Sequence, residues 1–534
     1  MNEHMLNVAW EDDKMFLKVL LILLPIILIF LLMVRKHLSA DLSGIIGWFV
    51  TLIIALFFFH TPIEIALRAS AAGIVASFPV SVMVVASILQ ITFMEATGAI
   101  KRITVFVKTL ASSDKAAQIM IINIGAGTLL VSVGATPVSI LPPILLALGY
   151  STFVAVALPA IGFDALCTFS LLGAPLVVYS DMTGVPLIQA AQVFAKYLPF
   201  VSPLIGFGML WIVGRFKLMK EGFFPCLLAG VTNGGVALIM SYTPILNTGI
   251  VLTGVVAGFC TIMVMLAYLK LSHKPIIDKS QLTAEDHEVA KGMSLATAFS
   301  PWIILIAASL IINFYPPLFN LLHTKLDMAL SIIPGQPIKT RALWNAYTWV
   351  FISTIVSIIF LKPTSGELSI TIKKWIKRAP RPAFSAAIFF AIAYVMNNSG
   401  FQKTDGIWQL LQPANNMIWV LAQSSSAAFG SLYPLVVAPL GLLGGFITGS
   451  EGSTIAMFAK YNMVTAKMLG MNALAITAAT SIGGGLASVI SPAKLQNAAA
   501  TIDAIGIESE VIKTTFMISI LITLVTAVLT MFMA

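Results

Sequence analysis

The sequence is dominated by apolar runs that are each long enough to cross a lipid bilayer. A helix needs about 20 residues to cross about 30 Å of hydrocarbon. Clean runs of that length lie at residues 16–34, 43–60, 193–213, 249–269, 343–361 and 512–533. Lipid offers the backbone no hydrogen-bond partners, so these spans are expected to be helices. With 58% hydrophobic and 10% charged residues, the chain is predicted to be an all-α polytopic membrane protein of about 12–14 helices.

The basic residues predict which side of the membrane each loop faces. Acidic residues precede the first apolar run, and Arg35 and Lys36 follow it, which is the reverse of the charge order in a signal peptide. By the positive-inside rule the N-terminus is predicted outside the cell, with the chain in the plasma membrane. The net charge of +9 is therefore interpreted as a topology signal, and no nucleic-acid partner is expected. The same rule places in the cytoplasm the basic stretches at 101–108, 215–220, 270–279 and 373–382.

A polar, charged loop at 273–292 is expected to lie in the cytoplasm and to divide the chain into two transmembrane halves. The halves are predicted to comprise residues 1–272 and 293–534. Both halves contain apolar segments that are interrupted by glycine, proline and hydroxyl residues. Similar interruptions at matching positions of two halves are typical of transporters built from repeats.

The four interrupted segments are the most informative part of the sequence. In the first half, residues 116–149 are expected to form a re-entrant hairpin, and residues 152–178 a broken helix. The matching segments of the second half are 444–458 and 480–497. Close helix packing could explain any one of them. Their pairing across the halves favours broken helices that line a shared cavity, because irregular backbone survives in a membrane only beside protein or cavity water.

Three ionisable residues lie within or beside these segments. Glu451 lies in GSEGST and Asp164 in GFDAL. A charged group in a membrane costs about 2.5–3.5 kcal/mol on insertion scales, so it is retained for a partner or a task. Both acids are predicted to carry the coupling proton or ion, although Glu451 could instead face an aqueous loop. Lys494 could balance a substrate carboxylate or extend its amine to the interface.

The same segments are suited to bind a small organic anion. Ends of broken helices present unpaired N–H groups and the positive end of the helix dipole. No arginine lies within the four motifs, so these donors and neutral hydroxyls would hold a carboxylate. The predicted substrate-binding residues are Ser132, Thr136, Ser139, Thr448, Gly449, Ser450, Ser453, Thr454, Gly484, Ser488, Ser491 and Lys494.

No motif of an enzyme or of a cofactor site is present in a credible context. The sequence lacks GxxxxGK[ST], HExxH and a strand-linked GxGxxG. Cys167, Cys226 and Cys260 have no CxxC spacing, so neither a disulfide framework nor a metal cluster is predicted. The six histidines fall in loops or at segment ends, which disfavours a proton relay inside the membrane. The chain is therefore not expected to be an enzyme or to bind a cofactor or metal.

At these residues the sequence resembles the L-lactate permease family, which also contains glycolate carriers. FITGSEGSTIAMFA (446–459) resembles the family's F-L-T-G-S-D-T-S-S-N-A-L-F. GGGLASVISPAKLQNAAATIDAIGIESE (483–510) resembles its G-G-V-x-G-K-M-I-S-P-Q-S-I stretch and V-G-x-x-G-x-E-S-[DE] ending. NNSG at 397–400 shows a weaker correspondence and adds Asn397 to the predicted site. The resemblance implies uptake or release of lactate-like 2-hydroxymonocarboxylates with protons in the cell membrane.

The sequence departs from the family pattern in its charged positions. The family's E-G-x-x-G-F-G-A-P-V-A-I corresponds here to LLVSVGATPVSI, so its acid is replaced by Leu129 and its second glycine by Leu130. Ser488 replaces a family lysine, whereas Lys494 lies six residues further on. Asp164 stands where the family commonly has an uncharged residue. Either charge has been relocated within one site, or this chain carries a different anion.

The sequence thus predicts a secondary active transporter of a small organic monocarboxylate, with L-lactate or a related 2-hydroxy acid as the leading expectation and proton symport as the mechanism. Two alternatives stay open: a transporter of another organic anion, with sodium as the coupling ion, and a non-concentrative anion channel. The expected partners are the anion, a coupling proton or sodium ion, and the lipid bilayer. The protein is expected to be a monomer or a homodimer.

Overall fold

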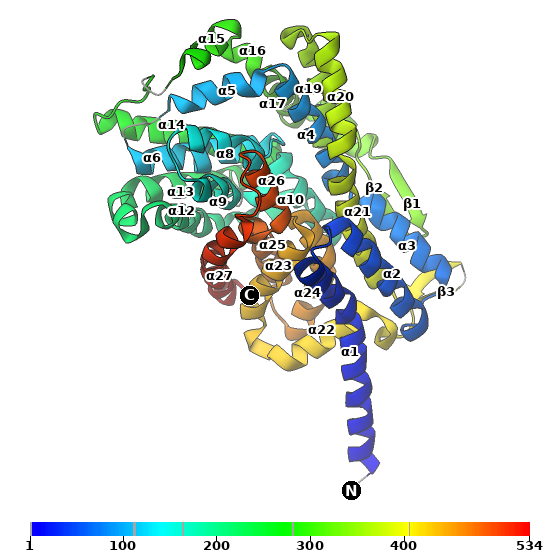
Figure 1. The fold of residues 1–534 in the computed structure, drawn as a ribbon. Coiled ribbons are helices and arrows are strands. Elements are labelled where there is room, and N and C mark those ends of the chain that lie inside the picture. Colours follow the sequence, from blue (N-terminus) through cyan, green and yellow to red (C-terminus); the bar gives the residue numbers. More distant parts are fainter. Residues whose placement is uncertain (1–2, 111–113, 163–164, 280–281, 405) are drawn as a thin grey trace.

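The computed structural model describes residues 3–110, 114–162, 165–279, 282–404 and 406–534, and these are almost entirely helical (Figure 1). Within them, eleven helices are long and apolar enough to cross a membrane, or thirteen when two sharply bent pairs each count as one span. Large apolar side chains such as Phe57, Ile359 and Phe532 are at least 70% exposed, as expected where lipid is the solvent. The prediction of an all-α polytopic membrane protein is confirmed.

The elements follow one another as a long series of helices with two short β-hairpins. The first half contains α1 (Glu3–Lys36), α2 (Ala40–Phe58), α3 (Ile63–Ala76), α4 (Phe78–Ala96), α5 (Ala99–Lys108), α6 (Lys115–Ile119), η1 (Met120–Ala126), α7 (Gly127–Ser132), α8 (Pro137–Ala147), α9 (Thr152–Gly162), η2 (Cys167–Phe169), α10 (Ser170–Thr183), α11 (Leu187–Ala195), α12 (Leu198–Glu221), α13 (Phe223–Tyr242), η3 (Asn247–Leu252) and α14 (Thr253–Leu271). The remainder contains α15 (Ala284–Gly292), α16 (Leu295–Ala298), α17 (Ser300–Phe314), α18 (Pro316–Phe319), η4 (Asn320–Lys325), β1 (Ala329–Ile333), β2 (Gln336–Lys339), α19 (Ala346–Leu361), α20 (Ser365–Arg378), α21 (Pro380–Asn397), β3 (Phe401–Thr404), β4 (Ile407–Leu410), η5 (Pro413–Asn415), α22 (Met417–Phe429), η6 (Gly430–Leu432), α23 (Tyr433–Thr448), α24 (Glu451–Leu469), α25 (Ala473–Leu486), η7 (Ala487–Ile490), α26 (Pro492–Ala500) and α27 (Glu508–Met533).

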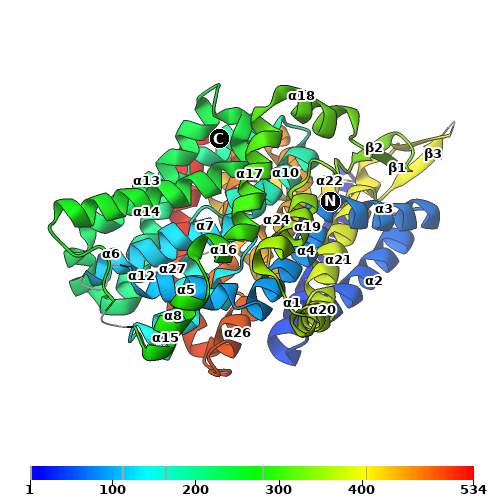
Figure 2. The same ribbon diagram turned by 90° about the horizontal axis from the view of Figure 1, so that it is seen from above.

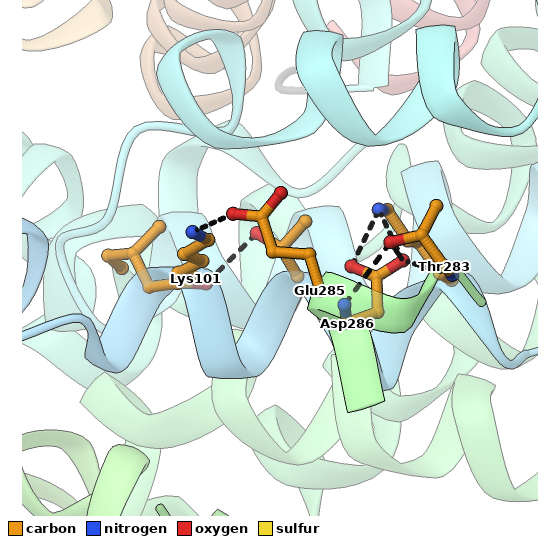
Figure 3. A network of polar contacts seen from close by, with 7 residues as sticks. Lys101, Thr283, Glu285 and Asp286 are labelled. Atoms are coloured by element: carbon orange, nitrogen blue, oxygen red, sulfur yellow. Dashed lines mark hydrogen bonds and ion pairs between the residues drawn. The ribbon is translucent and has the colours of Figure 1, made fainter. Parts of the chain in front are cut away.

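One end of the molecule, here called the basic face, is held together by ion pairs between distant segments. Helix α15, in the loop between the halves, is pinned to α5 by Lys108, whose amine lies 2.9 Å from the Asp286 carboxylate (Figure 3). Helix α20 is joined to the end of α4 by Arg378, 3.0 Å from Glu95. Helices α5, α15 and α20 lie along the upper edge of Figure 1. The basic face therefore brings together stretches that the sequence predicted to be cytoplasmic.

The opposite end, here called the hairpin face, carries two antiparallel hairpins, β1–β2 and β3–β4. Helix α2 runs from one face to the other. Near its start Asp41 lies 3.9 Å from Arg381, and beyond its end the Thr61 hydroxyl accepts a hydrogen bond from the Gly400 N–H at 2.9 Å. Figure 2 shows β1, β2 and β3 together at one edge of the helical body. These hairpins lie outside the long apolar runs, so the membrane-spanning part remains helical.

The first interrupted segment enters the helical body and returns to the same side. A bent run, α6–η1–α7, leads to Gly134, whose φ of 89° lies in the left-handed region that favours glycine. Helix α8 then begins with Pro137 in its first turn, where the missing N–H costs no helix hydrogen bond. After α8, Tyr150 lies over the Lys115 amine at 5.2 Å and donates a hydrogen bond to Gln118 at 2.8 Å. The two ends of the segment therefore meet.

The matching segment of the second half is a hairpin of α23 and α24. Its turn is Gly449, at φ 68°, followed by Ser450 as the N-cap of α24. The two arms run antiparallel, because the Tyr433 hydroxyl at the start of α23 donates a hydrogen bond to Asn462 of α24 at 2.8 Å. Asn462 also donates to Thr480 of α25 at 2.7 Å. Helix α25 thus lies against the hairpin and ends beside its tip.

Glycines allow the backbones of α23 and α25 to touch. A Cβ atom at Gly441 would lie 1.9 Å from the Thr480 carbonyl oxygen, and one at Gly445 would lie 2.1 Å from that of Gly484. Small residues permit such close helix approach in membranes. Gly484, which the sequence placed among the binding residues, lies within this packing contact.

The broken helix of each half packs on the hairpin of the other half. Helix α10, which follows the break of the first half, packs on α24, whereas α26, which follows the break of the second half, packs on α8 and α9. Helix α21 of the second half also packs against α2, α3 and α4. The two halves of the sequence are therefore interlocked, and neither encloses the breaks by itself.

Candidate functional site

The tips of the two hairpins lie on the same helix, α4. A Cβ atom at Gly134, in the first tip, would lie 2.7 Å from the Ser87 hydroxyl oxygen. A Cβ atom at Gly452, in the second tip, would lie 2.7 Å from a Val80 methyl carbon. Val80 and Ser87 are two helical turns apart on α4, a separation of about 10 Å along its axis. The two tips are therefore neighbours, although they come from different halves.

The break between α9 and α10 lies beside both tips. A Cβ atom at Gly254 would lie 2.1 Å from the Ser132 hydroxyl oxygen and 2.8 Å from the Phe169 carbonyl oxygen. The first tip and η2 thus share one neighbour on α14. On the other side, the Thr168 hydroxyl of η2 donates a hydrogen bond to the Glu451 carboxylate at 2.6 Å. This short break connects the two hairpin tips.

Glu451 is the first residue of α24 and is 4% exposed. The positive end of the α24 dipole stabilises negative charge at this position. The local sequence TGSEG builds the turn, because the Ser450 hydroxyl accepts a hydrogen bond from the Ser453 N–H at 3.4 Å. The Thr448 hydroxyl donates to the Ser450 carbonyl oxygen at 2.9 Å. A buried acid thus lies at a helix end and accepts a hydrogen bond from a donor of the other half.

A second helix begins next to the Glu451 turn. Ser491 is buried and is the N-cap of α26, and Pro492 occupies the first turn. A Cβ atom at Gly449 would lie 3.6 Å from the Ser491 hydroxyl oxygen. In the same stretch the Lys494 amine donates a hydrogen bond to the Ser488 hydroxyl. The beginnings of α24 and α26 and one lysine therefore lie close together, which is a suitable environment for an anion.

Four helices begin at the breaks. Helices α8, α24 and α26 start directly after them, and α10 becomes regular only after three left-handed residues, 171–173. The first turn of each helix has N–H groups without a partner inside the helix. Four helix N-termini in one region provide donors and a positive potential without an arginine.

Two hydroxyls in this region are buried without a hydrogen-bond partner among the described residues. They belong to Ser87, beside the first tip, and Ser453, in the first turn of α24. An unsatisfied buried polar group costs about 1–3 kcal/mol. A bound carboxylate or hydroxyl group would supply the missing partner, so these atoms indicate a ligand position near the tips.

The structure brings most of the predicted site residues to the breaks. The predicted residues that lie at a break or within one helical turn of it are Ser132, Thr136, Ser139, Thr448, Gly449, Ser450, Glu451, Ser453, Thr454, Gly484, Ser488, Ser491 and Lys494. Asn397 lies apart, at the end of α21, where its carbonyl oxygen accepts a hydrogen bond from Asn416 at 3.1 Å. Asp164 lies outside the described residues.

Two residues of this region were not singled out from the sequence. Thr168 lies inside the first-half motif GFDALCTFSLLGAPL, so the motif located it, but a threonine in an apolar run gives no sign of its partner. Ser87 lies in the continuous helix α4, where neither glycine nor an ionisable neighbour marks it. Only the packing of the tips on α4 identifies this serine.

The start of α24 is closely packed, whereas Thr136, Ser139, Gly449 and Ser450 at the hairpin tips are half-buried. Every residue from Glu451 to Ala459 is buried. A cavity of about 490 Å³ lies instead toward the hairpin face, where Val177 and Val178 of α10 form part of its wall. This cavity thus lies further along α10 than the breaks, where the sequence predicted a shared cavity.

Comparison with known proteins identifies relatives along nearly the whole chain. The sequence profile of the family described as L-lactate permease matches residues 18–534. The glycolate permease GlcA of Escherichia coli K12 is 26% identical, over 97% of this chain and 96% of its own length. The L-lactate permease of Bacillus subtilis 168 is 24% identical, over 97% and 96% of the two chains. The L-lactate permease of Escherichia coli K12 is 23% identical, over 98% and 97%.

Proposed function

Because this chain belongs to the L-lactate permease family, we propose that it is a secondary active transporter that carries a small monocarboxylate together with a proton across the plasma membrane. L-lactate or a related 2-hydroxy acid is the proposed substrate, in line with the names of the relatives. Permeases are transporters, so the chain is a transporter and not an enzyme. The observation that carries the proton coupling is the buried Glu451 carboxylate at the helix ends, hydrogen-bonded to Thr168 of the other half.

The substrate carboxylate would bind where the N-termini of α24 and α26 meet. The backbone N–H groups of these turns, the Ser453 hydroxyl and the Lys494 amine are suitable donors for an anion. A 2-hydroxyl group next to the carboxylate can exchange hydrogen bonds with a hydroxyl of the same turns, such as that of Thr454. The absence of arginine from the four motifs suits a ligand that must also be released.

Coupling would follow from repulsion between two carboxylates. A substrate anion and an ionised Glu451 would both occupy a region of low dielectric, and like charges at short distance disfavour ionisation of both. Binding of the anion therefore favours binding of a proton by Glu451, and by linkage the proton favours the anion. The pair moves no net charge, so the pH gradient supplies about 1.4 kcal/mol per pH unit.

Alternating access would use the two interlocked halves, 1–272 and 293–534. The site is built where their hairpins and broken helices meet, so a small rotation of one half can open it to either side. We place the basic face in the cytoplasm and the N-terminus outside, in keeping with the positive-inside rule. All parts of the site come from one chain, so a monomer is the proposed unit of transport.

Uptake into proteoliposomes tests the proposed function. Purified protein should accumulate radiolabelled L-lactate or glycolate when the outside is more acidic than the inside, and a sodium gradient alone should have no effect. Accumulation that follows sodium would replace the proton as the coupling ion. Equilibration without accumulation would indicate a channel, and no flux of any small carboxylate would contradict transport.

Substitution of Glu451 by glutamine tests the coupling role. Glu451→Gln keeps the shape but cannot exchange a proton, so accumulation driven by pH should fall to the level of empty liposomes. Exchange of internal for external lactate, which needs no net proton movement, should persist. Glu221→Gln, at an exposed acid at the end of α12, is the matched control and should accumulate normally. Unchanged accumulation by Glu451→Gln would remove this residue from coupling.

A further inference from the structure

A cavity of about 490 Å³ opens beside the last turn of α10 on the hairpin face. A single water molecule takes about 30 Å³ of liquid volume, so the cavity has room for a small organic acid. Its wall combines α10, the start of α4, α21 and the loop that follows β2. The residues of its wall are distinct from those of the breaks, which lie at the other end of α10.

The charged residues in the wall of this cavity are Lys339, Arg341 and Asp181. Each cation has an acidic neighbour, Asp181 for Arg341 and Asp327 for Lys339, so the wall offers an anion cationic donors without a net positive charge. The Lys339 amine lies 3.7 Å from the carboxylate of Asp327, which is not part of the cavity wall. Arg341 is the cation that lies deepest, with its side chain only 16% exposed.

Arg341 uses only part of its guanidinium group. One terminal nitrogen donates a hydrogen bond to Asp181 at 2.9 Å. Its Nε atom is buried and has no hydrogen-bond partner in the part of the chain that the structure describes. A guanidinium presents its donors as a planar fork that matches the two oxygens of a carboxylate. The unused Nε edge is therefore suited to a second carboxylate.

The loop after β2 holds Arg341 in place. The backbone of Arg341 has a φ of 41°. Non-glycine residues adopt this left-handed conformation at a cost, and such residues are common at functional sites. The Arg341 N–H donates a hydrogen bond to the Asp327 carbonyl oxygen at 2.8 Å, and the Thr340 hydroxyl donates to that of Met328 at 3.1 Å. The β1–β2 hairpin thus positions a cation over the end of α10.

We propose that Arg341 and this cavity form an outer binding site, where the carboxylate of the transported anion is held before it reaches the region of the breaks. Asp181 occupies part of the guanidinium in the absence of the anion, and the anion takes the Nε edge. This inference rests on the proposed function for the identity of the ligand. Ala174, where α10 becomes regular, and Asp181 are two helical turns apart, or about 10 Å. An anion released from the outer site is therefore a short distance from the region of the breaks.

External binding and initial uptake rates test the outer site. In proteoliposomes, Arg341→Gln should raise the KM for external L-lactate about tenfold, whereas Asp181→Asn should lower it several-fold because it frees the guanidinium. The double variant should behave like Arg341→Gln. Lys403→Gln removes an exposed cation of the hairpin face outside the cavity and is the matched control, with an unchanged KM expected.

The double variant separates ligand binding from a structural ion pair. If Arg341 served only to pair with Asp181, each single variant would be impaired and the double variant would recover. That result would overturn the proposal, as would an unchanged KM in Arg341→Gln. Tenfold weakening that persists in the double variant would support it.

A binding measurement that needs no transport distinguishes failure of this site from failure of the proposed function. Met182→Cys places a thiol in the cavity wall, in a background without the three native cysteines. External L-lactate should slow labelling by a charged thiol reagent, and Arg341→Gln should abolish this protection. Protection without accumulation would contradict the transport function alone. Equal labelling with and without lactate, in protein that accumulates it, would overturn the outer site alone.

Discussion

The two hairpin tips have the same backbone plan and different chemistry. Each turns at a left-handed glycine, Gly134 at φ 89° in the first and Gly449 at φ 68° in the second. After the first turn comes Thr136, whose side chain makes no capping hydrogen bond to α8. After the second comes Ser450, whose hydroxyl caps α24, and then Glu451. The shape of the tip is thus repeated, whereas the acid is present in the second tip only.

This difference teaches that the two halves contribute different groups to the region of the breaks. The second half supplies the carboxyl group, and the first half supplies the Thr168 hydroxyl that bonds to it at 2.6 Å. The first tip contributes packing on α4 beside Ser87. A repeat of backbone therefore does not require a repeat of function, and substitutions at matching positions should have unequal effects.

The largest expected effect on stability is at the glycine of the first tip. Gly134→Ala forces an alanine into a left-handed conformation, which costs about 1–2 kcal/mol, and its Cβ would lie 2.7 Å from the Ser87 oxygen. Overpacking adds about 1–3 kcal/mol. Gly449→Ala has the same backbone cost but an ordinary 3.6 Å contact with Ser491. Thermal unfolding in detergent should show a clearly lower midpoint for Gly134→Ala, and equal midpoints would contradict the packing of the first tip on α4.

The next effect concerns the hydrogen bond between the halves. Thr168→Val keeps the shape of the side chain and removes the donor to Glu451. A hydrogen bond to a charged group is worth about 1.5–3 kcal/mol, so proton-driven uptake should fall at least tenfold in kcat/KM. The control is Thr92→Val, because Thr92 is buried and bonds to the Ile88 carbonyl oxygen of its own helix at 2.7 Å. Equal uptake by Thr168→Val and the control would show that the first half does not assist the acid.

The smallest effect concerns the loop that joins the halves. Burial raises the pKa of the Asp286 carboxyl, but its hydrogen bonds with Thr283 and the Lys108 amine outweigh burial and lower that pKa below the ordinary value (Figure 3). A lowered folded pKa stabilises the protein at neutral pH, and this contribution is lost as pH falls through the folded pKa. Asp286→Asn should therefore cost about 0.5 kcal/mol at pH 7.

Comparison of two pH values checks the origin of this effect. The difference in unfolding midpoint between Asp286→Asn and the natural chain should vanish at a pH well below the ordinary aspartate pKa of about 3.9, where both side chains are neutral. Glu288→Gln is the control, since Glu288 forms an exposed ion pair with Lys291, one turn away at 3.1 Å. A difference that is independent of pH would mean that the charge of Asp286 is not involved.

The sequence by itself determined the membrane-embedded helical fold and the positions of the helix breaks. Both are local properties. The length of an apolar run decides whether it spans a bilayer. Two of the breaks lie at a glycine or proline, Gly449 and Pro492, although Pro25 and the glycines 483–485 lie inside helices. Glu451 could also be singled out from the sequence, because a charge inside such a run is costly and needs a partner or a task.

Short polar elements outside the membrane were harder to predict from the sequence. The stretch IIPGQPIK folds into the β1–β2 hairpin with Gly335 in its turn at φ 84°. A Pro-Gly pair indicates a turn, but an apolar chain of long helices gave no reason to give this loop a function. In the proposed outer site, the hairpin matters because Arg341 follows two residues after the end of β2.

Only the tertiary structure decided which groups meet. Thr168 and Glu451 are 283 residues apart, and Asp181 and Arg341 are 160 residues apart. Each pair depends on how several helices from both halves pack together, and no local pattern encodes that packing. A hydrogen bond needs a donor–acceptor distance within a few tenths of an ångström of its optimum. The packing of the two halves therefore decides which groups bond to a buried charge, and the local sequence does not.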